Sequence, residues 1–292
     1  MKIPVFWGCR ILTSQYAYEM SIREVFPFFN IKLVDLPETN CCGDPVKSMN
    51  VLGANYLAAR ILALAHMTAS DSLLVPCNRC HFTISEAKAF LKTEKTNQKI
   101  TSMLKEEDLE YDPNIKIWHV IDFLHDFVGL DNIKKAVKKP LKGLKLATHP
   151  GCQIIRYSDL KRVDDAENPR KLDELIGALG AQTVDYAEKL DCCGAALMQS
   201  HPDSALSLAG SKLKAVQNSA VDGLVVSCPD CGLMFDSKQK EAATTVGAKL
   251  DLPVVYYTQL LGLALNIDKR KLGLHLNQSP TDNLLMQAST QS

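Results

Sequence analysis

The ten cysteines of this 292-residue chain form one pattern that is written twice. Each copy has a single cysteine, then an adjacent Cys-Cys-Gly, then a Cys-x-x-Cys that 34 residues separate from the pair. The single cysteine precedes the pair by 31 intervening residues in the first copy and by 39 in the second. The two sets are Cys9, Cys41, Cys42, Cys77 and Cys80, and Cys152, Cys192, Cys193, Cys228 and Cys231. Scattered core cysteines would not repeat in this way, so each set is expected to form one metal or redox site.

The residues around the cysteines repeat as well. A glycine precedes each single cysteine and another follows each pair, namely Gly8, Gly43, Gly151 and Gly194. The repeated unit is about 140 residues long, which is longer than the unit of a solenoid protein. The repeat predicts two like domains, residues 1–142 and 143–292, that face each other about a pseudo-twofold axis. The polar tail from about residue 277 is expected to be mobile unless a partner covers it.

Short apolar runs alternate with segments of helical spacing in both halves. The runs predicted as strands are residues 3–7, 31–36, 72–75 and 115–120, then 144–148, 183–186, 224–227 and 253–257. Helices are expected from Thr13 or Ser14 to about Phe26, over residues 51–67, and from each Cys-x-x-Cys onward. Residues 92–114 are predicted as a helix end and a loop, and 131–143 as a basic linker. This order predicts an α/β fold, with two tandem Rossmann-like halves and parallel sheets.

Every group of cysteines follows directly after a predicted strand. Ligands of open α/β sheets bind at the carboxyl ends of the strands, so the five cysteines of one half are expected to converge there. The neighbouring glycines would allow a positive φ or the close approach of a bulky inorganic group.

Composition excludes several classes of function. Lys+Arg and Asp+Glu are equal at 33 each, so the basic excess of a general nucleic-acid binder is missing. The first residues do not resemble a secretory signal, and the most apolar segment, 51–67, is too short and too polar to span a bilayer. We therefore expect a cytoplasmic protein without a membrane span.

The cysteine spacing leaves several kinds of site open. A zinc ribbon usually has two Cys-x-x-Cys pairs at short spacing, and a cubane [4Fe–4S] cluster typically uses a compact C-x2-C-x2-C run. Neither pattern is present, and five cysteines per half exceed the four that a cubane needs. A thioredoxin-like dithiol would account for Cys77 and Cys80 but not for the other three cysteines.

The spacing C-x31-CCG-x33-CxxC and its second copy resemble the cysteine-rich CCG domain of the heterodisulfide reductase B subunit, over almost the whole chain. The resemblance implies that each five-cysteine set holds one [4Fe–4S] cluster of a noncubane type. It also implies an enzyme that reduces the mixed disulfide of coenzyme M and coenzyme B, the last step of methanogenesis. Its implied partners are a ferredoxin-like C subunit, a flavin-containing and iron–sulfur-containing A subunit, and a hydrogenase or formate dehydrogenase that acts through the A subunit.

Two sites in one chain fit that chemistry, because a disulfide needs two electrons and an iron–sulfur cluster normally delivers one. The substrate is anionic, so a neutral protein needs a local cationic patch. The candidates for binding it are Arg10, Lys47, Arg79 and Arg156, and those for delivering protons to the thiolates are His81 and His149. A charged insertion near residues 158–169 is expected at the surface, where it would dock a neighbour or shape the pocket mouth.

Other functions remain open from the residues alone. Related CCG proteins transfer electrons within flavoprotein dehydrogenases, including enzymes of succinate oxidation, or belong to sulfur-oxidising relatives of the reductase. A non-catalytic assembly module that a metal stabilises is the third class.

Overall fold

The computed structural model describes residues 1–292 except 93, 158–159, 161 and 290–292, and it contains two four-stranded parallel sheets. The first sheet has the order β2-β1-β3-β4 and the second has the order β6-β5-β7-β8. Their strands are β1 Lys2–Val5, β2 Lys32–Asp35, β3 Ser72–Leu74 and β4 Lys116–Trp118, then β5 Lys145–His149, β6 Gln182–Thr183, β7 Gly223–Val226 and β8 Val254–Tyr256. The matching orders confirm the predicted α/β fold of two tandem Rossmann-like halves.

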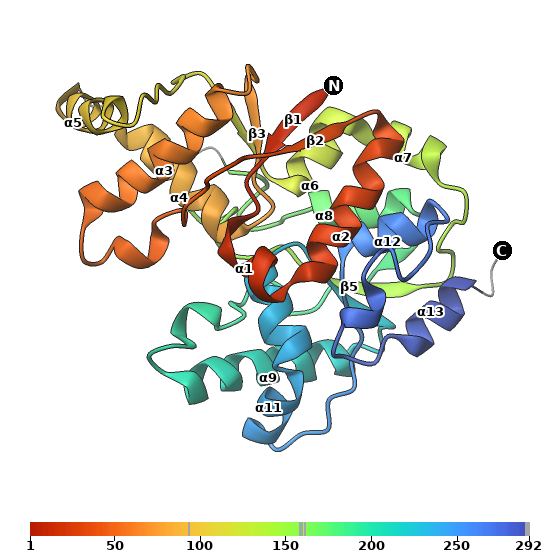
Figure 1. The fold of residues 1–292 in the computed structure, drawn as a ribbon. Helices are drawn as coiled ribbons and strands as arrows, with labels where there is room; N and C mark the ends of the chain where they lie inside the picture. The colour runs from red at the N-terminus through yellow and green to blue at the C-terminus, as the bar shows by residue number, and fades with distance from the viewer. Residues whose placement is uncertain (93, 158–159, 161, 290–292) are drawn as a thin grey trace.

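Helices connect the strands in both halves (Figure 1). Those of the first half are α1 Gly8–Ser14, α2 Tyr16–Val25, α3 Val51–His66, α4 Asn78–Phe90, α5 Glu94–Lys105, α6 Val120–Asp122 and α7 Leu130–Ala136. Those of the second half are α8 Lys171–Ala178, α9 Pro202–Asn218, α10 Pro229–Gly232, α11 Gln239–Thr245, α12 Tyr257–Ala264 and α13 Asp282–Ser289. A π-helical segment extends α6 over Phe123–Gly129 and another extends α10 over Leu233–Ser237.

The helix predicted from Thr13 or Ser14 to about Phe26 corresponds to α2, which begins at Tyr16. Neither Thr13 nor Ser14 caps it, because both lie at the end of an additional short helix, α1, and their hydroxyls donate to carbonyls one turn earlier. Cys9 lies in the first turn of α1. Gly8 adopts a φ of +71°, a value that a glycine reaches without strain.

Three segments predicted as irregular are partly helical. Residues 92–114 contain α5, which buries Ile100 and Leu104, and the expected linker at 131–143 begins inside α7. The tail contains α13, and Leu284 on that helix is 1% exposed. The tail is therefore packed against the protein through Leu284, with Leu285 and Ala288 partly buried against the same core. The prediction failed because the composition of the tail is mostly polar, whereas a few apolar side chains are enough to anchor it.

The first sheet separates two layers of the core, because side chains alternate between its faces. Phe6, Leu73 and Val75 face one cluster of buried residues, which α3, α4 and α5 complete. Ile3, Val5 and Leu74 belong to a second, larger cluster that also contains the core of the second half. The two halves therefore share one hydrophobic core.

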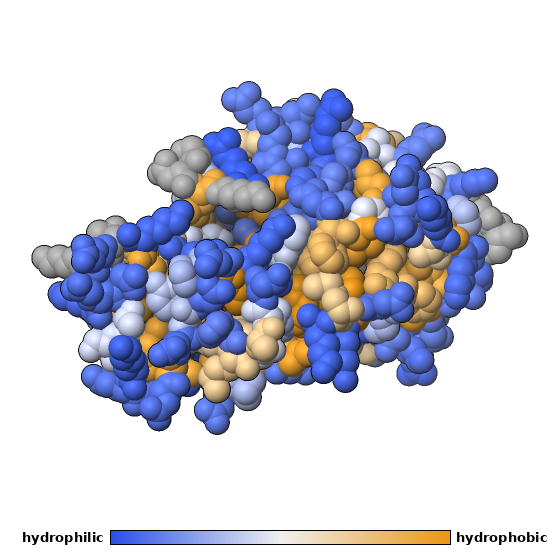
Figure 2. Space-filling model, turned by 90° about the horizontal axis from the view of Figure 1, so that it is seen from above, coloured by the Kyte–Doolittle hydropathy of each residue, from blue (hydrophilic) through white to orange (hydrophobic). Residues whose placement is uncertain are grey.

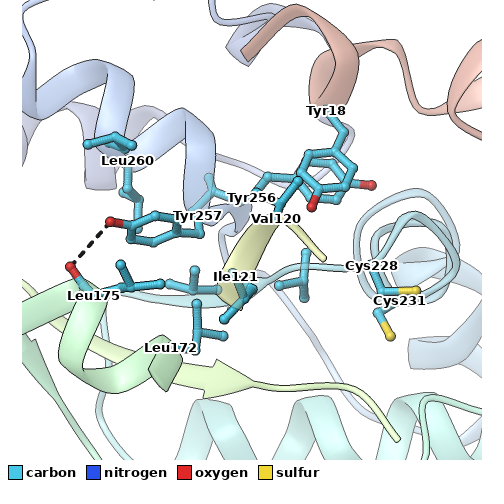
Figure 3. Close-up of a cluster of buried hydrophobic side chains, with 14 of the residues drawn as sticks. Tyr18, Val120, Ile121, Leu172, Leu175, Cys228, Cys231, Tyr256, Tyr257 and Leu260 are labelled. Carbon is cyan, nitrogen blue, oxygen red and sulfur yellow. Dashed lines mark hydrogen bonds between the residues drawn. The ribbon is translucent and has the colours of Figure 1, made fainter. Parts of the chain in front are cut away.

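The shared core centres on the contact between α2 and α12, which lie side by side between the halves (Figure 1). Tyr18 on α2 stacks on Tyr256 with ring centroids 4.1 Å apart. Ser21 and Thr258 share a buried hydrogen bond of 2.6 Å. Figure 3 shows the two stacked tyrosines beside Cys228 and Cys231, so the apolar junction reaches the cysteines directly.

Polar side chains cover much of one face of the molecule (Figure 2). Seen from above, this face carries mostly hydrophilic residues with smaller hydrophobic areas between them. Within the described residues, no helix combines the length and the apolar character needed to cross a membrane.

Because the halves share a core, the chain should unfold in one cooperative transition. Ile22→Ala, at a fully buried position of α2 in the shared core, should lower the free energy of unfolding by about 2–5 kcal/mol and shift the whole transition. Leu12→Ala, at a position that is 44% exposed, is the control and should change little. Calorimetry and circular dichroism test this prediction; two separated transitions would contradict it.

Candidate metal centres

The cysteines lie at the carboxyl edges of the two sheets, as predicted. In the first half, Cys9 follows β1, Cys41 and Cys42 follow β2, and Cys77 directly precedes α4 after β3. The second half repeats this placement after β5, β6 and β7. Adjacent parallel strands end at the same edge, so residues far apart in sequence converge there.

The thiols form one continuous row that runs through both halves. Each thiol interacts with the next, in the order Cys9, Cys41, Cys42, Cys80, Cys77, Cys228, Cys231, Cys193, Cys192 and Cys152. The sulfurs of Cys231 and Cys193, for example, are 3.6 Å apart. The five cysteines of each half are thus contiguous, and the two sets meet at Cys77 and Cys228.

Exposure falls toward the middle of the row. Cys9 is exposed, whereas Cys41, Cys152 and Cys192 are partly buried. The six inner cysteines are at most 5% exposed; they are Cys42, Cys77, Cys80, Cys193, Cys228 and Cys231. Each half therefore has a buried dithiol turn and a more open outer end.

Equivalent residues of the two halves meet at the junction, as a pseudo-twofold axis requires. Arg79 and Asp230 occupy the same position between the cysteines of their Cys-x-x-Cys turns, and Arg79 Nε lies 3.0 Å from Asp230 Oδ2. The Tyr18 hydroxyl lies between the equivalent carbonyls of Pro76 and Ser227, at 3.4 and 2.9 Å. One tyrosine hydroxyl thus ties the two turns together.

The loop of each Cys-Cys-Gly packs against a helix in the same way in both halves. Gly43 and Gly194 have φ values of +96° and +84°. A Cβ on either glycine would lie 2.5 Å from a backbone oxygen, that of Ala54 on α3 or Ala205 on α9. Only glycine permits this approach, so it fixes the cysteine pair against the start of the helix.

The chemistry of these residues fits iron–sulfur sites. All ten cysteines are free thiols, and soft thiolates are the ligands that iron–sulfur clusters use. The N-terminus of α4 at Cys77 favours negative charge, which suits a thiolate ligand.

Comparison with known proteins agrees with this chemistry. The cysteine-rich domain (CCG) family matches residues 3–85 and 146–236. The B subunit of the ferredoxin/F420H2-dependent CoB-CoM heterodisulfide reductase of Methanosarcina acetivorans is 34% identical over 94% of this chain and 93% of its own length. The chain belongs to the family of heterodisulfide reductase B subunits. Its members are oxidoreductase subunits, and clustered cysteines of this kind are typical of iron–sulfur electron-transfer proteins.

Two further similarities extend this result. The membrane anchor subunit of the 8-methylmenaquinol:fumarate reductase of Wolinella succinogenes is 30% identical over 94% of this chain and 96% of its own length. A hypothetical protein from Helicobacter pylori has a solved structure that covers 95% of this chain and 51% of its own, with a TM-score of 0.76 and 16% identity. The second similarity concerns the fold alone.

The four basic residues predicted to bind the substrate all have partners within this chain. Arg10 donates to Asp230 at 3.2 Å, and Arg79 donates to Asp44 at 3.2 Å while also lying beside Asp230. Lys47 pairs with Glu86, and exposed Arg156 donates to the Leu190 carbonyl. The structure thus brings Arg10 and Arg79 together at the junction and leaves Lys47 and Arg156 apart from them.

The two histidines predicted to deliver protons are buried. Burial, and then the nearby His119, lower the pKa of His81 to about 3, so this ring is neutral at pH 7. Burial also lowers the pKa of His149 well below its ordinary value. His149 lies with Cys193 and Cys231, its ligand atom within 4.8 Å of both sulfurs. His119, directly after β4, is fully buried and caps α6.

A basic groove that was not predicted runs along α4 between the two halves. Its volume is about 360 Å3, and its cationic lining residues are Lys88, Lys92, Lys116 and Arg162. His81 also lines it, whereas none of the ten cysteines is among the described residues of its wall. Arg162 comes from the charged insertion, whose exposed members include Asp165 and Glu167; Ser158, Asp159 and Lys161 lie outside the described residues.

The sequence analysis also missed Asp230 and Lys212. The sequence places Asp230 between two cysteines, but it does not reveal that two arginines of the other half pair with this carboxylate. Lys212 is a lysine on the buried face of α9, 2% exposed, which an alignment of the two halves would have marked as unusual.

The close approach of the Cys-Cys-Gly loop can be tested with matched glycine variants. Gly247→Ala, at a φ of +58° with no atom within 4 Å of the new Cβ, should cost about 1–2 kcal/mol of stability from backbone strain alone. Gly194→Ala also has a positive φ, +84°, but meets Ala205 O, so it should cost about 1–3 kcal/mol more and lower the iron content of its half. Thermal unfolding and iron analysis measure both effects. Equal losses in the two variants would contradict the prediction.

Proposed function

We propose that this chain is the catalytic subunit of a heterodisulfide reductase, which reduces the mixed disulfide of coenzyme M and coenzyme B to two thiols as the last step of methanogenesis. Residues 1–142 and 143–292 would each hold one noncubane [4Fe–4S] cluster through their five cysteines. When bound, each cluster supplies one electron, and the disulfide needs two.

One observation carries this proposal: the two five-cysteine sets form a single row that meets at Cys77 and Cys228. Two electron carriers that work independently could lie anywhere on the two halves. Two sites that act on the two sulfur atoms of one disulfide have to lie close together. The meeting of the two cysteine sets at the junction therefore supports a reaction that uses both sites on one substrate.

The chain's own residues would bind and orient the substrate. The substrate carries a sulfonate at one end and a phosphate and a carboxylate at the other, so it needs cations. Arg10 and Arg79 lie beside Asp230 in the second Cys-x-x-Cys turn, and the basic groove along α4 offers Lys92 and Arg162. His81 lines the same groove, where its lowered pKa keeps the ring neutral, so its proposed part in proton delivery would be limited to a hydrogen bond.

The partners follow from the same proposal. The ferredoxin-like C subunit would pass electrons to this chain from the flavin-containing A subunit, which a hydrogenase or formate dehydrogenase would reduce in turn. The similarity to the B subunit of M. acetivorans supports a role within such a complex.

A second candidate is an electron-transfer subunit of a quinol-linked fumarate reductase. The 30% identity to the W. succinogenes subunit, over almost the full length of both chains, favours it specifically. A sulfur-oxidising relative of the reductase is a variant of the first candidate. Electron paramagnetic resonance with added coenzyme M or coenzyme B separates these functions, because only direct binding of a substrate thiol should create a new signal in the oxidised protein.

The assignment of one site to each half predicts paired effects of two equivalent substitutions. Cys42→Ser and Cys193→Ser should each remove about half of the iron, or about four atoms, and each should abolish reduction of the disulfide. Iron and acid-labile sulfide analysis of the anaerobically purified protein measures the loss. A protein that holds zinc and no sulfide would refute the assignment.

The electron donor gives a further prediction. The C-x2-C-x2-C run of a ferredoxin is missing from the sequence, so electrons have to come from another protein. The isolated chain should reduce the disulfide only with an artificial low-potential one-electron donor, and adding the ferredoxin-like C subunit should restore physiological turnover. Efficient turnover of the isolated chain with NADH or reduced flavin would contradict this.

A further inference from the structure

Lys212 is a buried lysine without a carboxylate partner. Its Nζ donates to His149 Nδ1 at 2.8 Å and to the carbonyls of Lys189 and Asp191 at 2.9 and 2.8 Å. Among the described residues, no carboxylate forms an ion pair with it at 4.0 Å or less. An ammonium has three donors, and all three are used. Burial lowers the pKa of Lys212 to about 8, so the amine is still mostly charged at pH 7.

The contact with Lys212 fixes the tautomer of His149. An ammonium only donates, so Nδ1 accepts, and the neutral imidazole carries its proton on Nε2. Nε2 is buried and has no hydrogen-bond partner among the described residues. An unpaired buried donor is unfavourable, and the groups gathered with this ring are the sulfurs of Cys193 and Cys231. The N–H is therefore available to sulfur at the second thiol site.

The first half has no such pair. Phe6 and His149 both lie two residues before the glycine that precedes the single cysteine. The identical glycine contacts of α3 and α9 set the register of these helices, which places Ile61 opposite Lys212. Phe6 and Ile61 are both buried in the apolar core. The second site thus has the hydrogen-bonded pair of Lys212 and His149 where the first site has two apolar side chains.

The other cations near the thiols are compensated or exposed. Asp230 lies beside both Arg10 and Arg79, and Asp44 also pairs with Arg79. Arg156, which faces His149 from the neighbouring loop, is exposed to solvent. Lys212 therefore differs from these three cations in being both buried and without a carboxylate partner.

We propose that Lys212, acting through His149, gives the second thiol site a higher reduction potential than the first. The inference rests on the proposed function in one respect, that each half holds an iron–sulfur centre. Hydrogen bonds to sulfur and nearby positive charge stabilise the reduced, more negative form of such a centre. Each centre takes up one electron and no proton moves, so Lys212 is a positioning residue. Electrons then collect in the second half.

A redox titration followed by electron paramagnetic resonance tests the proposal on the complex purified anaerobically with its partner subunits. Lys212→Met should lower the reduced-to-oxidised ratio of one centre about tenfold at a fixed potential, a shift of about 59 mV for one electron. His149→Phe, which copies the first half, should shift the same centre in the same direction. Lys214→Met removes an exposed charge from the same helix and should shift neither.

The Cys193→Ser variant identifies which signal belongs to the second half. The proposal is overturned if both centres shift equally, or if neither shifts while the iron content is unchanged. Should Lys212→Met fail to fold, His149→Gln keeps an amide donor toward the sulfurs and should retain the potential that His149→Phe loses; equal potentials in these two variants overturn it. Wild-type protein without iron in either half would instead refute the proposed function.

Discussion

The contact between the two Cys-x-x-Cys turns is the interaction on which the site depends. Cys77 and Cys228 each precede a helix at the end of a central strand, and they meet because the two sheets point their carboxyl edges at each other. The contact also buries Arg79 and Asp230, one from each turn, and their opposite charges compensate each other in an ion pair. The Tyr18 hydroxyl donates to the Ser227 carbonyl at the junction, where buried polar groups need such partners.

The shared core holds this contact rigidly. The stacking of Tyr18 on Tyr256 and the hydrogen bond between Ser21 and Thr258 join α2 to α12 across the junction. Neither half can turn against the other without exposing that core, so the spacing of the two sites is set by packing. A pair of electron carriers gains from this arrangement, because transfer requires no closure of domains around the site.

The fold was largely predictable, since its signals are local. All eight predicted strands are present, and the cysteine sets converge as expected from their position after the strands. The second strand of the second half is shorter and earlier than predicted, at Gln182–Thr183, because only its first residues pair with β5. What the sequence could not provide was the junction. Asp230, Tyr18 and Lys212 acquire their roles from partners more than 50 residues away, which no periodicity reveals.

The burial of the inner thiols has a consequence for biogenesis. The outermost thiol, Cys9, remains open to solvent, whereas the six inner ones are at most 5% exposed. Both halves cover Cys77 and Cys228, and only the ends of the row are open to solvent. Under the proposed function, iron and sulfide for the six inner thiols would have to arrive before the two halves pack together.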